Sequence, residues 1–188
     1  MSLLSQSTVS NKISLNGVGI HTGKKVNLNI LPASPNSGII FKRVDLKDNN
    51  IVIPNFENVS EATLCTTISN QYGVKVSTIE HLMAAFLGLG IDNAIVELDS
   101  QEVPILDGSA MNFVKVIKET GLKNSDIPIK LIKINNKVEI EVGKKSISIE
   151  KSNTTLEIEF EINYENQLIN NQKNKISVFE DKLDNVYN

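Results

Sequence analysis

The sequence predicts an α+β fold: a two-layer sandwich of a mostly antiparallel sheet and two helices, followed by the truncated opening sheet of a second, similar domain. Three observations predict it. Strand-type and helix-type patterns are segregated along residues 1–122 and do not alternate, which favours a sheet covered by helices. Two segments, 78–87 and 109–120, have helical periodicity. Beyond residue 126, alternating segments follow one another with no evident helix.

The strands of the first domain are predicted from the alternation of polar and apolar residues. Residues 25–31 alternate at period two, as a half-buried strand does, and Pro32 and Pro35 interrupt the pattern. Residues 51–61 are less regular, with Pro54 in the middle, and are typical of a loop or a small insertion. Further short strands are expected at 39–41, 63–69, 75–77 and 94–98.

The first helix is predicted at 78–87. Ser77 is a good N-cap and Glu80 follows three residues later, which is the spacing of a capping box. Gly88 and Gly90 are expected to end the helix. One apolar stripe at helical spacing is expected to face the core, and it consists of Ile79, Leu82, Met83, Phe86 and Leu87.

The second helix, at 109–120, is expected to end at Gly121. Its core stripe is predicted to be Phe113, Val116, Ile117 and Thr120. The polar segment that follows, 123–126, is the predicted boundary between a first domain, 1–122, and an incomplete second domain, 127–188.

The second domain is predicted to contain only strands. They are expected at 129–134, 137–142, 146–149 and 156–164. Residues 165–174 are polar, and the last dozen residues are the remaining place for a helix. A sheet with one uncovered apolar face is not a finished domain, so the pattern predicts a truncated chain.

The composition is that of a globular protein and excludes some classes of function. Of 188 residues, 40% are hydrophobic and 22% are charged. The net charge of −3, without a basic cluster, argues against nucleic acid as a partner. No window reaches the roughly 18 to 20 apolar residues of a transmembrane helix, and the N-terminus lacks a signal-peptide pattern. The single cysteine, Cys65, suits a reducing compartment, so a cytoplasmic location is expected.

The adjacent residues Glu80 and His81 are the first candidates for chemistry, since they place a potential general base beside a potential metal ligand. His81 lies off the apolar stripe, on a face with the small residues Ala84, Ala85 and Gly88, which leave room beside the imidazole. A second interpretation stays open: Glu80 is half of a capping box, and His81 is a hydrogen-bonded structural or surface histidine.

Five strings of the sequence resemble the zinc-dependent UDP-3-O-acyl-N-acetylglucosamine deacetylases of lipid A biosynthesis. They occur in the order of that family and at about its spacing, and together they cover nearly all of residues 5–122. The strings are GVGIHTGK at 17–24, GIIFKRVD at 38–45, VSTIEHLMAA at 76–85, GIDN at 90–93 and EVPILDGSA at 102–110.

The resemblance implies a two-domain enzyme with its active site between two similar α+β sandwiches. Such an enzyme uses Zn²⁺ to hydrolyse the N-acetyl amide of a UDP-linked, acylated glucosamine. Glu80 matches the general base of the family and His81 matches a metal ligand. Leu64 and Cys65 match residues beside the metal that contact the substrate, and Tyr164 matches an aromatic residue that packs on the uracil ring.

Some of these residues have simpler interpretations. Cys65 would also suit a small buried apolar position, and Tyr164 would suit the core of a sheet. After Tyr164 the chain reads Glu165-Asn166, where the family often has His-Pro. His21, in a glycine-rich stretch, is expected to form a tight turn and not to bind metal, and Asp107 is expected to be a turn or cap acid.

The remaining metal ligands of the family are not found in this sequence. The family draws them from a His-Lys-x-x-Asp segment of the second domain, and no such segment occurs among the 188 residues. We therefore expect the chain alone to be inactive. Two alternatives stay open: a non-catalytic binding or assembly module, and one half of a split enzyme that needs a complementing C-terminal half.

Overall fold

The computed structural model describes residues 5–152 and 156–178 of the chain. The chain divides into two compact units, with the division between Ile129 and Lys130.

The first unit is built on a five-stranded sheet. In spatial order the strands are β2 (Ile13–Val18), β3 (Lys25–Pro32), β9 (Ala94–Leu98), β4 (Ile39–Arg43) and β5 (Ile51–Val52). Strands β4 and β9 are parallel, and the other neighbours are antiparallel. Along β3 the residues Val26, Leu28 and Ile30 are buried and alternate with more exposed ones. The alternation that predicted this strand is therefore confirmed.

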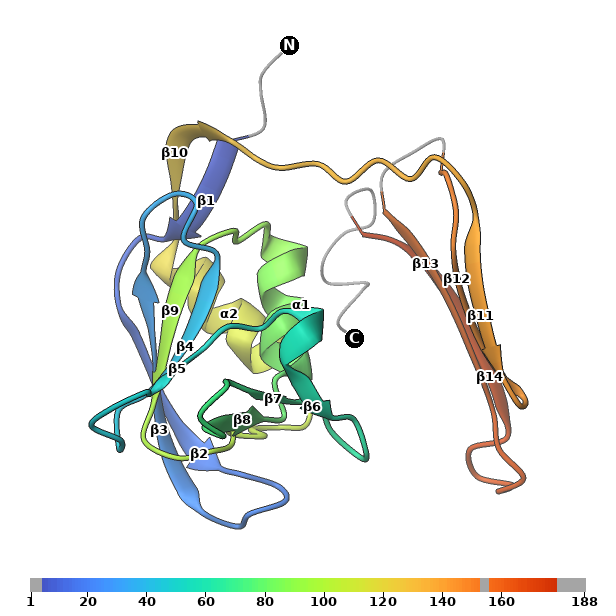
Figure 1. Ribbon diagram of the computed structural model, residues 1–188, viewed down its shortest axis with the longest axis horizontal. Helices are drawn as coiled ribbons and strands as arrows, with labels where there is room; N and C mark the ends of the chain where they lie inside the picture. Colours follow the sequence, from blue (N-terminus) through green and yellow to red (C-terminus); the bar gives the residue numbers. More distant parts are fainter. Residues whose placement is uncertain (1–4, 153–155, 179–188) are drawn as a thin grey trace. The chain divides into compact units, whose positions relative to one another are not determined.

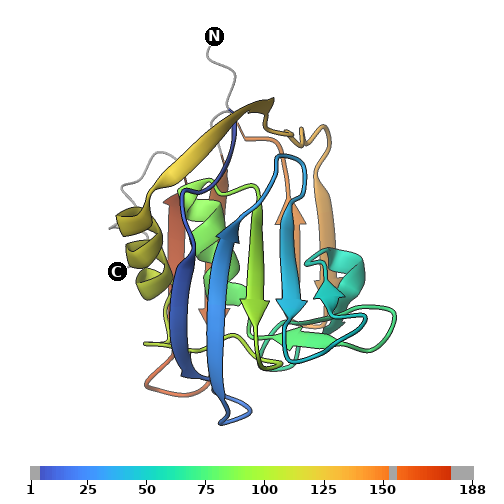
Figure 2. The same ribbon diagram turned by 90° about the vertical axis from the view of Figure 1, so that its left-hand side faces the viewer.

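Two helices, α1 (Glu80–Leu89) and α2 (Met111–Thr120), pack against each other on one face of this sheet (Figures 1 and 2). The core contains Phe41 from β4, Phe86 from α1 and Phe113 from α2, all fully buried. Sheet and helices thus form the two layers of an α+β unit, and the predicted fold class is confirmed.

Two smaller sheets complete the first unit. Strand β1 (Ser5–Val9) pairs with β10 (Leu122–Pro128), and β6 (Val59–Glu61), β7 (Thr67–Ser69) and β8 (Lys75–Ser77) form a three-stranded sheet after a short 3₁₀ helix (Phe56–Asn58). The polar segment 123–126 therefore lies inside β10 and not between the units. Its polar side chains did not indicate a strand because the pairing with β1 is made by main-chain groups.

The start of α1 corrects the predicted capping box. Ser77 ends β8, and its N–H donates to the carbonyl oxygen of Gln101 (2.9 Å). The helix begins after Ile79 without a side-chain cap, and the Glu80 carboxylate accepts a hydrogen bond from Thr66 instead. The capping box is therefore wrong, since Ser77 is held in a strand by a segment distant in sequence. Of the two glycines expected to end the helix, Gly88 lies inside it, and Gly90 caps it in the left-handed conformation (φ 68°).

The predicted helix stripes are partly confirmed. On α1, Leu82 and Phe86 are buried as expected, but Leu87 is 48% exposed and Ala85 is buried in its place. On α2, Phe113 and Ile117 are buried together with Val114, which the stripe did not include.

The second unit contains two antiparallel pairs, β11 (Val138–Val142) with β12 (Lys145–Ile149), and β13 (Glu157–Asn163) with β14 (Asn171–Ser177). The strand predicted at 129–134 is not formed. By contrast, β14 begins in the polar stretch that was not expected to be a strand, and Asn171 pairs with Asn163. The apolar residues of β11 and β12 are exposed, and the described residues of this unit include no helix. Most of the last dozen residues lie outside the described part.

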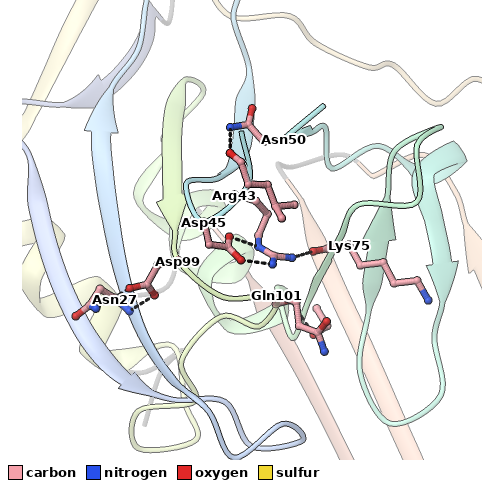
Figure 3. A network of polar contacts seen from close by, with 9 residues as sticks. Asn27, Arg43, Asp45, Asn50, Lys75, Asp99 and Gln101 are labelled. Atoms are coloured by element: carbon pink, nitrogen blue, oxygen red, sulfur yellow. Dashed lines mark hydrogen bonds and ion pairs between the residues drawn. The ribbon is translucent and has the colours of Figure 1, made fainter. Parts of the chain in front are cut away.

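Arg43, the only arginine of the sequence, joins the end of β4 to β8 (Figure 3). Its Nε and Nη2 donate to the two carboxylate oxygens of Asp45 (2.8 and 2.6 Å), and its Nη1 donates to the carbonyl oxygen of Lys75 (2.9 Å). The guanidinium holds the pKa of Asp45 below its usual value. Asp45 thus holds the guanidinium, and the bond from Arg43 to Lys75 links the large sheet to the three-stranded sheet.

We expect Arg43→Gln to lower the free energy of unfolding at pH 7 by about 1–3 kcal/mol, because charge-assisted hydrogen bonds are lost. The pKa of Asp45 is lower in the folded state than in the unfolded chain. Its contribution is therefore complete above about pH 4 and is lost as the pH falls through the lowered pKa. In urea unfolding, the free energy of unfolding of the variant should therefore fall less than that of the wild type between about pH 5 and about pH 3.

The matched control is Lys42→Gln on the same strand. Lys42 pairs with Glu97 at 3.0 Å, but this pair is more exposed than that of Arg43, so a loss of about 0.2–1 kcal/mol is expected. Equal losses in the two variants would contradict the role given to Arg43.

Candidate functional site

Glu80 and His81 are the first two residues of α1, and both are half-buried. Thr78, just before them, turns the chain from β8 into the helix with a left-handed conformation (φ 58°). Consecutive side chains on a helix point about 100° apart. The carboxylate and the imidazole therefore lie on different sides of the helix start, and they can act on one group without competing for it.

The Glu80 carboxylate is oriented by the main chain of the 64–67 segment. Its Oε1 accepts a hydrogen bond from the N–H of Thr66. Within the described residues this is its one hydrogen bond, and Oε2 has no protein donor. One oxygen is thus anchored while the other is left for a ligand or a proton, which is the arrangement that a general base needs.

The imidazole of His81 can serve as one metal ligand, but one ligand does not form a metal site. A catalytic zinc is held by three protein ligands. No group of three His, Cys, Asp or Glu side chains that could hold a metal ion occurs among residues 5–152 and 156–178. The described residues therefore do not fit a complete zinc centre.

A cavity of about 410 Å³ lies beside the segment that anchors Glu80. Leu64 and Cys65 line it, as do His21, Lys75 and Gln101. Glu80, His81 and Thr66 are not among its lining residues, but Thr66, which donates to Glu80, lies in the chain between the lining residues Cys65 and Thr67. The structure thus brings Leu64 and Cys65 close to the start of α1, although Cys65 and Glu80 are 15 positions apart in the sequence.

Leu64 and Cys65 differ in their surroundings. Leu64 is 89% exposed and has a left-handed backbone (φ 66°), an unfavourable conformation for a non-glycine residue. Cys65 is half-buried, with its Sγ 3.8 Å from the Oγ1 of Thr67. An apolar side chain held out into solvent beside a cavity is available to a ligand.

His21 and Asp107 occupy turns, as the sequence predicted. The turn from β2 to β3 is closed by the N–H of Gly23, which donates to the carbonyl oxygen of Gly19 (2.9 Å), and His21 is exposed at its tip. Asp107 accepts hydrogen bonds from the N–H and Oγ of Ser109, and the N–H bond lowers the pKa of Asp107. The position of His21 at the cavity was not predicted, because Leu64 and Cys65 lie more than 40 residues away in sequence.

Tyr164 belongs to the second unit and directly follows β13. Its N–H donates to the carbonyl oxygen of Asn170 (3.1 Å), and the residue is 55% exposed. Within the described residues its ring is therefore not part of a sheet core, and it stays a predicted nucleotide contact.

Glu102 occurs in the family string at 102–110, and the sequence predicts no separate role for it. Its side chain is completely buried, and it accepts hydrogen bonds from the N–H groups of His21 (3.0 Å) and Thr22 (2.8 Å) and from the Oγ1 of Thr78 (2.9 Å). Burial alone would raise the pKa of Glu102, but these hydrogen bonds outweigh it and lower the pKa. No local pattern indicates this, because its partners lie 24 to 81 residues away.

Comparison with known proteins finds the same family that the five sequence strings resemble. The model of a family described as UDP-3-O-acyl N-acetylglycosamine deacetylase matches residues 6–186. Proteins named UDP-3-O-acyl-N-acetylglucosamine deacetylase from Shewanella baltica (strain OS155), Shewanella sp. (strain W3-18-1) and Shewanella oneidensis are 46%, 45% and 44% identical to the chain over 143 residues. These alignments cover 76% of the chain and 47% of each relative, so the chain spans about half the length of the curated relatives it matches.

Among the described residues, no helix combines the length and the apolar character needed to cross a membrane. The family match extends over both compact units and includes Glu80, His81, Leu64, Cys65 and Tyr164. The chain therefore belongs to the UDP-3-O-acyl N-acetylglycosamine deacetylase family.

Proposed function

We propose that this chain takes part in removing the N-acetyl group from UDP-3-O-acyl-N-acetylglucosamine, an early step of lipid A synthesis, as a portion of a zinc-dependent amidohydrolase. The observation that carries the proposal is the Glu80 carboxylate, which is anchored through one oxygen beside a potential metal ligand in a member of the deacetylase family. The single, half-buried cysteine suits the reducing cytoplasm, where we place the reaction.

In this proposal the residues of the chain have separate roles. Glu80 takes the proton of the attacking water at Oε2 while Oε1 stays bonded to Thr66. His81 would be one ligand of the zinc, and the other ligands would have to come from outside the described residues. Zinc bound in this way would supply a Lewis acid for the amide carbonyl and would lower the pKa of the water.

The substrate contacts proposed for this chain are Leu64, Cys65 and Tyr164. The exposed side chain of Leu64 and the thiol of Cys65 line the cavity of about 410 Å³ and are available to the acylated sugar. The exposed ring of Tyr164 is available to the uracil, because an aromatic ring stacks on a nucleobase.

The test is a deacetylation assay with two preparations. One is the 188-residue chain with added zinc, and the other is the chain co-expressed with the remaining half of the Shewanella baltica relative. We expect acetate release from UDP-3-O-acyl-N-acetylglucosamine in the second preparation and none in the first. If the complemented chain is inactive while the relative's own two halves are active together, the chain is a non-catalytic module and the proposal is wrong.

We expect Leu64→Asn to leave the free energy of unfolding unchanged or to raise it by up to about 1 kcal/mol, because asparagine tolerates the left-handed backbone. The same variant should raise the KM for the acylated substrate several-fold, since the apolar contact is lost. Leu64→Val is the matched control: it keeps an apolar side chain, but its branched Cβ should destabilise the fold at this φ. A KM that is unchanged in Leu64→Asn would exclude the substrate contact.

A further inference from the structure

Glu102 is the only carboxylate among the described residues that is completely shielded from solvent. Among the described residues no cation pairs with it; its hydrogen-bond donors are neutral and include the N–H groups of His21 and Thr22 and the hydroxyl of Thr78. A buried carboxylate is costly unless its oxygens are hydrogen-bonded, and here both are. The buried carboxylate therefore fixes the positions of the main-chain N–H groups of the turn and of the Thr78 hydroxyl.

The two oxygens of Glu102 have different partners. Oε1 accepts from the N–H of His21 and the Oγ1 of Thr78, and Oε2 accepts from the N–H of Thr22. The amide group of a glutamine would place NH₂ against a main-chain N–H in either orientation. Only an ionised carboxylate on a side chain of this length satisfies all three donors.

The backbone around Glu102 is adapted to this arrangement. Gly19 lies so close to Oε2 that an added Cβ would overlap it. Thr78 has a branched Cβ and a positive φ (58°), which is an unfavourable combination that its surroundings must maintain. The Thr78 hydroxyl donates to Glu102, and the Thr78 N–H donates to the carbonyl oxygen of Thr66 (3.1 Å).

These contacts join Glu102 to the candidate catalytic residues. Thr78 is followed directly by Ile79, Glu80 and His81, so its conformation sets where α1 begins. Thr66 accepts from Thr78 through its carbonyl oxygen and donates to Glu80 through its N–H. A continuous series of hydrogen bonds thus runs from Glu102 through Thr78 and Thr66 to Glu80.

We propose that Glu102 is a positioning residue that fixes the orientation of Glu80 and His81 by holding Thr78 in its left-handed conformation, and that it docks the 19–23 turn beside the substrate cavity. The inference rests on the proposed function, since it assigns an indirect role in the reaction of Glu80. Glu102 touches no substrate in this role. It acts through Thr78 and through the turn that carries His21.

The test uses Glu102→Gln and the pair Thr78→Val and Thr78→Ser, with Glu97→Gln as a matched carboxylate-to-amide control on β9. In the 188-residue chain, the amide signal of Thr66 reports its bond to Glu80. We expect Glu102→Gln and Thr78→Val to shift this signal and to speed its hydrogen exchange by at least about 10-fold, the size expected for local opening. The amides of Ile30 and Val96 in the central sheet should keep their exchange rates, and Thr78→Ser should resemble the wild type.

In the complemented enzyme, Glu102→Gln should lower kcat by about 10-fold or more with little change in KM, because a misplaced base affects the transition state and not binding. Glu97→Gln should leave both values unchanged. Uniformly faster exchange of all amides, or a kcat equal to that of the wild type, would overturn the positioning role.

Two safeguards keep the result decisive. If Glu102→Gln does not fold, the comparison of Thr78→Val with Thr78→Ser gives the answer, since these differ in the hydroxyl that Glu102 accepts from. If the complemented wild type releases no acetate, the proposed function fails. In that event, a change of the Thr66 amide signal alone would still support the claim that Glu102 orients Glu80 through Thr78. An unchanged Thr66 signal would overturn that claim.

Discussion

Glu80→Gln is expected to lower kcat for deacetylation in the complemented enzyme by about 10²–10⁴-fold, the usual contribution of a general base. The glutamine oxygen can still accept the hydrogen bond from Thr66, so the start of α1 should keep its shape. What is lost is the basic oxygen at the other position. Because the fold is expected to stay intact, the rate of acetate release under saturating substrate measures the effect of losing the base on kcat.

The control for this prediction is Glu119→Gln on the exposed side of α2, which should leave kcat within about 3-fold of the wild type, because exposed positions away from a site contribute little. Circular dichroism and the Thr66 amide signal would verify that Glu80→Gln is folded. A folded Glu80→Gln variant with wild-type kcat would show that Glu80 is not the base.

Phe86→Ala is expected to lower the free energy of unfolding by about 3–5 kcal/mol, the usual range for truncating a buried phenylalanine. Phe86 is 1% exposed and fills the core between α1 and the sheet. The loss would be a large part of the roughly 5–15 kcal/mol that stabilises a typical domain. Urea unfolding monitored by circular dichroism measures it.

Leu87→Ala on the same helix is the matched comparison. Leu87 is 48% exposed, so we expect its truncation to cost about 1 kcal/mol or less. Both variants place alanine, the best helix former, at adjacent positions of α1, so helix propensity adds only about 0.5 kcal/mol or less in favour of either variant. Losses of similar size would mean that Leu87 is buried in solution and that the helix faces the sheet differently.

The features predictable from sequence are those that one segment determines by itself. Alternation identified β3, and the spacing of Leu82 and Phe86 identified the buried side of α1. Gly90 marked the helix end because the left-handed cap is a local requirement. The adjacency of Glu80 and His81 made them candidates, the family strings favoured that interpretation over a capping box, and the structure adds the anchor of Glu80 at Thr66.

The features that were missed depend on pairing between distant segments. Ser77 has the local character of an N-cap, but bonds with the 101–103 segment keep it in a strand. The polar strands β10 and β14 are stabilised by main-chain pairing, which leaves no apolar pattern in the sequence. Leu87 fits the stripe as well as Phe86 does, and only the position of the sheet decides which of them is buried.

The pairing of β1 with β10 also constrains how the first unit is made. Ser125 of β10 donates to the carbonyl oxygen of Gln6, 119 residues earlier in the chain. On the ribosome, residues 5–9 are synthesised first, yet their partner strand emerges only after almost the whole unit has been made. Closing so long a loop is entropically unfavourable until the intervening sheet and helices have shortened the path. During translation the main-chain groups of β1 that pair with β10 therefore remain unpaired until β10 has been synthesised. In that interval they are accessible to chaperones and proteases.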